Sequence, residues 1–306
     1  MAEGVRAMVH SPELIRELEQ RSRDLYRDVI DIFQGSLEAT GGRGGHVGGT
    51  LSLIQIVTAL YFHHIRFDPK NPRWEGRDRV ILSKAHCCEA LYAALIELGV
   101  IDRKWIPTYY QYRSPLQGHA DRWCTPGIEF SGGSLGEGLS HGLGVALAAT
   151  IQRPKYSHPP SLTYKLPPKY RVYCILGDGE CHEGEVWEAA MAASTYKMDN
   201  LVAIVDYNKY CIDGPVDEVI RLDPFSEKWR SFGWSVIEVN GHDLAQLVDA
   251  LDLTDVLYGD GKPKCILAHT VKGKGVPYWE ERHAHYARED LARIGIAQAR
   301  EAMRGG

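Results

Sequence analysis

Apolar residues follow two patterns that alternate along the chain, short unbroken runs and longer stretches with helical spacing. A short run rich in β-branched and aromatic residues, ended by glycine or polar residues, is typical of a buried strand. The alternation predicts an α/β fold with a mainly parallel sheet and helices on both faces. The expected strands are Val80–Leu82, Val172–Leu176, Leu201–Val205, Gly233–Val239 and Pro263–Ala268; the expected helices are Pro12–Phe33 as one helix or two, Leu51–Phe62, Cys88–Leu98, 139–150, Glu183–Lys197, Phe225–Trp229 and Asp243–Leu251.

The segment 170–215 carries the strongest chemical signal, because a strand, a helix and a second strand follow one another at the length of a parallel βαβ unit. Asp178 and Asn208 come just after the two strands, thirty positions apart. Ligands of open α/β sheets bind at these carboxyl ends. A carboxylate, an amide oxygen and a loop carbonyl suit Mg²⁺. Each residue alone would be read as a turn or loop residue, but the combination favours a ligand site.

Two further segments display histidines on loops. The glycine-rich stretch Thr40–Thr50 predicts an ordered ligand loop that presents Arg43 and His46, with Thr50 capping the next helix. His86 lies where the strand Val80–Leu82 gives way to a helix, so it can donate to a phosphate or serve only as a cap. Glycines at the start of the predicted helix 139–150 and within it imply close backbone packing; they are Gly138, Gly142 and Gly144.

Gly177-Asp178-Gly179 followed by Asn208 forms the thiamine-diphosphate signature, and the stretches GDGECHEGEVWEAAMAAS and NLVAIVDYNKYCIDGP resemble transketolase. The resemblance extends to GGHVGG, SKAH, PLQGH and SGGSLGEG, with Ala85 departing from the glycine usual before the histidine. It implies that residues 1–306 form a single diphosphate-binding domain with an N-terminal helical segment. It also implies thiamine diphosphate and Mg²⁺, or another divalent cation, as cofactors.

The resemblance also implies roles for individual residues. His46 and His119 would face the ketose hydroxyls or shuttle protons, and Glu183 with Glu188 resembles acids placed at a dimer interface near the cofactors, although both also suit a helix start. Either His283 or His285 would reach the site. The expected cofactor contacts are His86, Gly133, Ser134, Leu135, Gly177, Asp178, Gly179 and Asn208, and the expected metal ligands are Asp178, Asn208 and the carbonyl of Tyr210.

The activity implied is transfer of a two-carbon ketol unit from a ketose or its phosphate to an aldose or its phosphate. The pyrimidine-binding and C-terminal domains of a transketolase are expected on a separate partner chain, in an α2β2 assembly, and the chain alone is expected to be inactive. Two alternatives remain, the α subunit of a 2-oxo-acid dehydrogenase and a non-catalytic cofactor-binding regulatory chain. A Rossmann enzyme is disfavoured because no G-x-G-x-x-G opens a helix.

Composition limits the classes of partner and the cellular compartment that are expected. A net charge of −5 argues against nucleic acid or an anionic membrane as the main partner. Seven cysteines without a CxxC pair suggest free thiols in a reducing compartment, and no secretory signal or bilayer-length apolar run is found, so a cytoplasmic protein is expected. The proline-rich stretch Gln152–Tyr170 is interpreted as a surface excursion or a partner contact.

Overall fold

The computed structural model describes residues 10–42, 44–151 and 169–305. One sheet with strand order β1-β2-β3-β5-β4 lies at its centre, and every neighbouring pair of strands is parallel. The predicted α/β class is therefore confirmed. The expected surface excursion Gln152–Tyr170 falls mostly outside the described residues, as does Arg43. The strands are β1 (Arg79–Leu82), β2 (Val172–Gly177), β3 (Leu201–Tyr207), β4 (Ser235–Asn240) and β5 (Lys264–His269).

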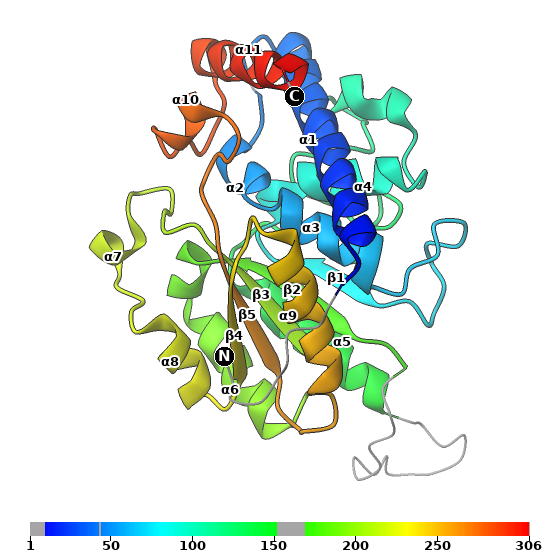
Figure 1. Ribbon diagram of the computed structural model, residues 1–306, viewed down its shortest axis with the longest axis vertical. Coiled ribbons are helices and arrows are strands. Elements are labelled where there is room, and N and C mark those ends of the chain that lie inside the picture. The colour runs from blue at the N-terminus through cyan, green and yellow to red at the C-terminus, as the bar shows by residue number, and fades with distance from the viewer. Residues whose placement is uncertain (1–9, 43, 152–168, 306) are drawn as a thin grey trace.

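Helices pack on both faces of this sheet, as Figure 1 shows. Alternate residues of β2 point to opposite faces: Tyr173 and Ile175 belong to one hydrophobic core, while Val172 and Cys174 belong to the other. The first core is closed by α1, α3, α4 and α9, and the second by α5, α6 and α8. The helices are α1 (Pro12–Thr40), α2 (Val47–Leu51), α3 (Ile54–Ala59), the π-helix η1 (Leu60–His64), η2 (Ala85–Cys87), α4 (Cys88–Glu97), η3 (Arg103–Thr108), α5 (Glu137–Thr150), η4 (Gly179–His182), α6 (Gly184–Thr195), α7 (Val216–Val219), α8 (Phe225–Ser231), α9 (Leu244–Val256), α10 (Pro277–Glu280) and α11 (Glu289–Gly305).

The N-terminal helix α1 is continuous, which settles the choice between one helix and two. Ser11 caps it by accepting a hydrogen bond from the Leu14 amide at 3.2 Å, and Pro12 occupies the first turn. Its end is marked by Gly41 in the left-handed conformation, whose amide donates to the Leu37 carbonyl. Its apolar face meets α3, α4 and α11, so the helix closes one side of the first core (Figure 1).

The helix expected to begin after Thr50 begins earlier, so the prediction that Thr50 is a cap is wrong. Thr50 lies inside α2, where its hydroxyl donates to Glu89 at 2.8 Å. Gly48 and Gly49 are helical too, because α2 presses against its neighbours: a Cβ on Gly49 would lie 2.7 Å from the Cys87 sulfur. The segment then continues as α3 and η1 in place of one regular helix.

Not all three glycines of α5 that were expected to pack closely do so. Gly138 lies against Ser83, and Gly142 makes ordinary contacts with β2 and β3. Gly144 is exposed with no neighbour of the described chain in the way of a Cβ, so close packing was wrongly expected there. None of the helices described has the length and apolar character needed to cross a bilayer.

Candidate functional site

The site is built at the carboxyl ends of β2 and β3, where the sequence placed it. The two strands pair in parallel from Val172 opposite Leu201 to Gly177 opposite Asp206. Asp178 therefore leaves the sheet beside the end of β3, and Asn208 follows one residue after that strand ends. Both side chains are buried. The predicted pair of oxygen donors is thus brought to one edge of the sheet.

A buried ion pair lies directly beneath this edge. Lys84 donates from Nζ to Oδ2 of Asp206, and the two side chains are only 3% and 0% exposed. Ser52 Oγ and Asn208 Nδ2 also donate to that oxygen, at 2.6 and 2.9 Å. Burial alone would raise the pKa of Asp206, but Lys84 holds it below its ordinary value, so the carboxylate stays charged. The pair fixes the loop of Lys84 and His86 against β3.

Four histidines from separate segments gather above this ion pair. The His46 ring lies 5.2 Å from that of His86, and 5.5 Å from those of His119 and His285, measured between centroids. Of the two histidines left open by the sequence, His285 joins this cluster, because Ala287 donates to the Gly45 carbonyl at 3.1 Å. The His283 ring instead stacks on the Tyr210 ring, with 3.5 Å between the ring centroids.

Burial keeps three of these imidazoles neutral, those of His46, His86 and His285. It lowers the pKa of His46 to about 3 and that of His285 to about 4, with neighbouring positive groups adding to the effect. The pKa of His86 is also lowered by burial and by Lys84. The Nδ1 atom of His46 is buried and makes no hydrogen bond to any described residue. A neutral ring with a free nitrogen can accept a hydrogen bond or a proton from a ligand.

Two buried glutamates hold the surrounding loops. Glu89 accepts from Tyr109 at 2.6 Å and from the His46 amide at 3.3 Å, and burial raises its pKa to about 7. Glu180 accepts from Ser83 and from the amides of Gly136 and Gly177, at 2.8 and 3.0 Å for the amides. Each carboxylate thus fixes a loop that carries a predicted site residue.

The donors present fit a hard divalent cation. Asp178 Oδ1 accepts a hydrogen bond from the Gly179 amide at 2.7 Å. Burial raises the pKa of Asp178 to about 7, and the negative charge of Asp206 adds to the shift. A cation beside Asp178 would favour its charged form. The Tyr210 carbonyl accepts from Lys272 Nζ at 3.2 Å. A cation with this carbonyl, the Asn208 amide oxygen and Asp178 would have three oxygen ligands. Gly179 lets Cys211 pack directly on the turn after Asp178, since a Cβ at Gly179 would lie 2.6 Å from the Cys211 Cβ.

The remaining predicted residues form the exposed rim. His119 is exposed and lines a cavity of about 360 Å³ together with Tyr110, Gln117 and Ser131. Gly133, Ser134 and Leu135 precede α5 and are exposed or half-buried. Glu183 is the exposed N-cap residue of α6, without a side-chain capping bond, and Glu188 is exposed one turn further on.

Sequence reasoning missed the charged groups that support the site. Lys84, Asp206, Glu89, Glu180 and Lys272 are all buried. A signal was available for two of them, because Glu89 stands in an otherwise apolar helix and Asp206 ends an apolar strand. A charged residue at such a position is rarely buried unless it is paired.

The family follows from comparison with known proteins. Residues 36–304 match the family described as transketolase, thiamine diphosphate binding domain. The chain belongs to this transketolase family. It is 39% identical over 285 residues to the 6-deoxy-6-sulfo-D-fructose transketolase subunit SqwG of Clostridium sp. (strain MSTE9), covering 92% of this chain and 98% of that one. It is 41% identical over 266 residues to an apulose-4-phosphate transketolase subunit of Phocaeicola vulgatus, covering 87% and 86%.

Solved structures agree with this assignment. The transketolase from Leishmania mexicana superimposes with a TM-score of 0.80 at 28% identity, over 94% of this chain and 41% of that one. The chain thus spans about two fifths of the solved transketolases it resembles. The predicted thiamine-diphosphate-binding fold and the transketolase class are confirmed, and the dehydrogenase and regulatory alternatives are not favoured.

Proposed function

We propose that the chain is the N-terminal, cofactor-binding subunit of a two-chain transketolase, and that residues 1–306 form its single diphosphate-binding domain. The observation that carries the proposal is the meeting of Asp178 and Asn208 at adjacent parallel strand ends, below a cluster of neutral histidines. This arrangement supports a diphosphate held through a divalent cation, with a reacting sugar beside the imidazoles.

Thiamine diphosphate, when bound, supplies the nucleophilic carbon and electron sink for breaking the carbon–carbon bond beside a ketose carbonyl. The chain's own residues bind and orient the reactants. Asp178, Asn208 and the Tyr210 carbonyl would hold Mg²⁺ or another divalent cation. His86, with Gly177 and Gly179, would bind the diphosphate, and Gly133, Ser134 and Leu135 would line the rest of the cofactor.

The histidines would form hydrogen bonds to the sugar and transfer protons. Because burial keeps His46 neutral, it can accept or donate a hydrogen bond at a ketose hydroxyl, and its free Nδ1 atom supports this role. His119 would act from the exposed side of the cluster, 5.5 Å away between ring centroids. Glu183 would lie at a subunit contact near the cofactor, in keeping with its exposure at the start of α6.

A partner chain would supply the pyrimidine-binding part, in an α2β2 assembly. Support comes from relatives that are named as subunits and are matched over 98% and 86% of their lengths. The chain also exposes large apolar side chains that are close in sequence to His119 or Tyr210: Tyr112 is 91% exposed, Trp123 80% and Ile212 61%. A partner that covers them would bury apolar surface and close the rim of the site.

The substrates would be a ketose donor and an aldose acceptor, free or phosphorylated. The relatives act on a sulfonated deoxy-ketose and on apulose 4-phosphate by their names, which favours testing modified and branched ketoses alongside ordinary pentose phosphates. A cytoplasmic location is proposed from the thiols alone, since all seven cysteines are free.

Cofactor binding gives the direct test. Isothermal titration with thiamine diphosphate and Mg²⁺ compares the unaltered chain with Asp178→Asn. Removing one charged ligand is expected to weaken binding at least about tenfold, which corresponds to about 1.4 kcal/mol. Asp213→Asn, an exposed acid five positions after Asn208, is the matched control and should bind as the unaltered chain does. Undiminished binding by Asp178→Asn would refute the proposed site.

The two-chain proposal is tested separately. Ketol transfer is measured with the purified chain, and again after a candidate partner chain is added. Activity is expected only in the mixture. Full transfer activity of the purified chain alone would remove the need for a partner while leaving the cofactor site intact.

A further inference from the structure

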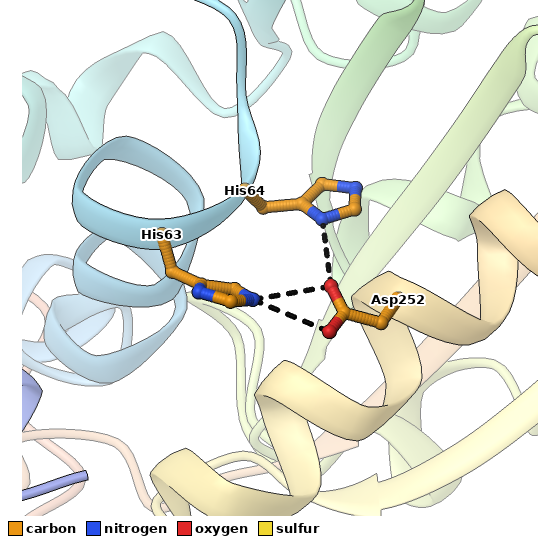
Figure 2. Close-up of side chains that lie close together, drawn as sticks. All are labelled: His63, His64 and Asp252. Carbon is orange, nitrogen blue, oxygen red and sulfur yellow. Dashed lines mark hydrogen bonds and ion pairs between the residues drawn. The ribbon is translucent and has the colours of Figure 1, made fainter. Parts of the chain in front are cut away.

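A second group of ligand-type side chains lies away from the cofactor site. Figure 2 shows His63 and His64 at the end of η1, both pointing at Asp252 on α9. His63 Nε2 lies 3.1 Å from Asp252 Oδ1, and His64 Nδ1 lies 3.2 Å from the same oxygen. The three ligand atoms lie within 4.8 Å of one another. No other group of three histidine, cysteine or acidic side chains in the described ranges meets this spacing.

The local backbone explains how two consecutive histidines reach one point. Residues Leu60–His64 form a π-helix, closed by a 2.9 Å hydrogen bond from the Ile65 amide to the Leu60 carbonyl. A π turn is wider than an α turn, so successive side chains diverge less around it. The chain becomes extended at Ile65, which leaves both rings at the free end of the helix. Such π turns are often found at functional sites.

A third imidazole, that of His10, lies beside Asp252 but outside this group of three ligand atoms. His10 Nε2 lies 3.8 Å from Asp252 Oδ2 and 2.9 Å from Asp249 Oδ1, and its ring centroid is 5.9 Å from that of His63. His10 Nε2 and Asp249 Oδ1 are both buried, and within the described part of the chain neither makes a hydrogen bond of acceptable geometry. Asp249 and Asp252 share a face of α9, one turn apart.

We propose that His63, His64 and Asp252 bind a transition-metal ion of the zinc class. Two imidazole nitrogens and one carboxylate oxygen, with water as a fourth ligand, suit a four-coordinate zinc ion better than Mg²⁺, which prefers oxygen ligands. The bound ion would join η1 and α9 in one cross-link.

This site is distinct from the cofactor site. Tyr173, which contacts His64, is the second residue of β2, whereas Asp178 follows its last residue. At about 3.3 Å per residue the two positions are about 16 Å apart along the strand, at opposite ends of the sheet.

The second ring nitrogen of His64 has the kind of hydrogen-bond partner that a metal-binding histidine usually has. His64 uses Nδ1 toward Asp252, while its other nitrogen, Nε2, lies 2.9 Å from the Tyr173 hydroxyl and 3.6 Å from Asp255. A partner on the second nitrogen fixes the tautomer and the ring orientation. The side chains of His63 and Asp252 are 20% and 24% exposed, so an ion can reach them from solvent.

The test uses the untagged full chain with zinc alone. After incubation with zinc and dialysis, elemental analysis is expected to find one zinc per chain. Cobalt in its place should give the visible bands of a tetrahedral ion without a sulfur-to-cobalt charge-transfer band, since no cysteine is a ligand. His63→Ala and Asp252→Asn should each weaken zinc binding at least about tenfold, and Tyr173→Phe about tenfold through its contact with His64.

Two control variants separate this site from others. His269 forms an exposed histidine–glutamate pair with Glu238 at 3.3 Å, so His269→Ala should leave zinc binding unchanged. His46→Ala, in the histidine cluster at the other end of the sheet, should also leave it unchanged. Circular dichroism confirms that the metal-free variants fold. Loss of stoichiometric zinc in either control, its retention in His63→Ala and Asp252→Asn, or no stoichiometric zinc in the unaltered chain would overturn the proposal.

Discussion

Two glycines on one helix should respond to the same substitution with opposite signs. Gly138 lies in the first turn of α5, where its amide donates to Ser83 Oγ at 3.1 Å. A Cβ there would lie 2.6 Å from the Ser83 Cα and still closer to the side chain. Gly144 lies in the middle of the same helix, is exposed, and has open space around an added Cβ.

The expected free energies follow from this difference. Alanine in place of glycine in a helix interior stabilises by about 1 kcal/mol, so Gly144→Ala should raise the free energy of unfolding by about that amount. Gly138 lies in the first turn, outside the helix interior, so Gly138→Ala lacks this gain and carries an overpacking cost of about 1–3 kcal/mol or more. Ser83 cannot move away easily, because it also donates to the buried Glu180. The two variants should therefore differ by about 2–4 kcal/mol.

Urea unfolding followed by circular dichroism measures both free energies, and thermal unfolding should separate the variants by several degrees. Gly138→Ala should also weaken thiamine diphosphate binding, because Glu180 holds the turn at Gly177. Equal effects of the two substitutions would refute the packing argument, as would a stabilised Gly138→Ala.

Two further predictions concern buried titratable groups. The pKa of His46 is about 3 in the folded chain against an ordinary value of 6.5, so the unfolded chain binds the extra proton between these pH values. The free energy of unfolding should therefore fall with decreasing pH by about 1.4 kcal/mol per pH unit below about pH 6. In urea titrations at several pH values, His46→Gln should remove this share of the pH dependence. Parallel pH dependences of the unaltered chain and His46→Gln would contradict the prediction. Lys84→Met should cost about 3–5 kcal/mol of unfolding free energy by leaving Asp206 unpaired, whereas the exposed Lys104→Met should change it only slightly; equal losses would contradict the role of burial.

The parts of the site that follow from local pattern were predictable. Strand, turn and helix signals around Asp178 and Asn208 fixed the topology, and parallel pairing of neighbouring strands then brought the two residues together. The histidine cluster was half visible, because His46 and His86 stand at loop and helix junctions. The place of His285 depends on hydrogen bonds between the glycine loop and a segment about 240 positions later, which no local pattern shows.

Tertiary packing overrode local preference elsewhere. Glycines 48 and 49 predicted a loop, but they lie in α2 because only a bare backbone fits against Cys87 and Lys272 there. The pairing of Lys84 with Asp206 joins residues 122 positions apart, and the sequence contains several other candidate partners for each. Buried charges of this kind are fixed by the assembled core, so they appear only once the fold is known.

The register of the two central strands bears on how such proteins can vary. Six consecutive residue pairs, from Val172 with Leu201 to Gly177 with Asp206, align the two donors without any help from the connecting helix. Binding therefore does not require the separation of thirty residues between Asp178 and Asn208. Natural lengthening of the crossover after Thr195 could be absorbed at the far end of the sheet, while a single residue inserted within either strand would turn a donor to the opposite face.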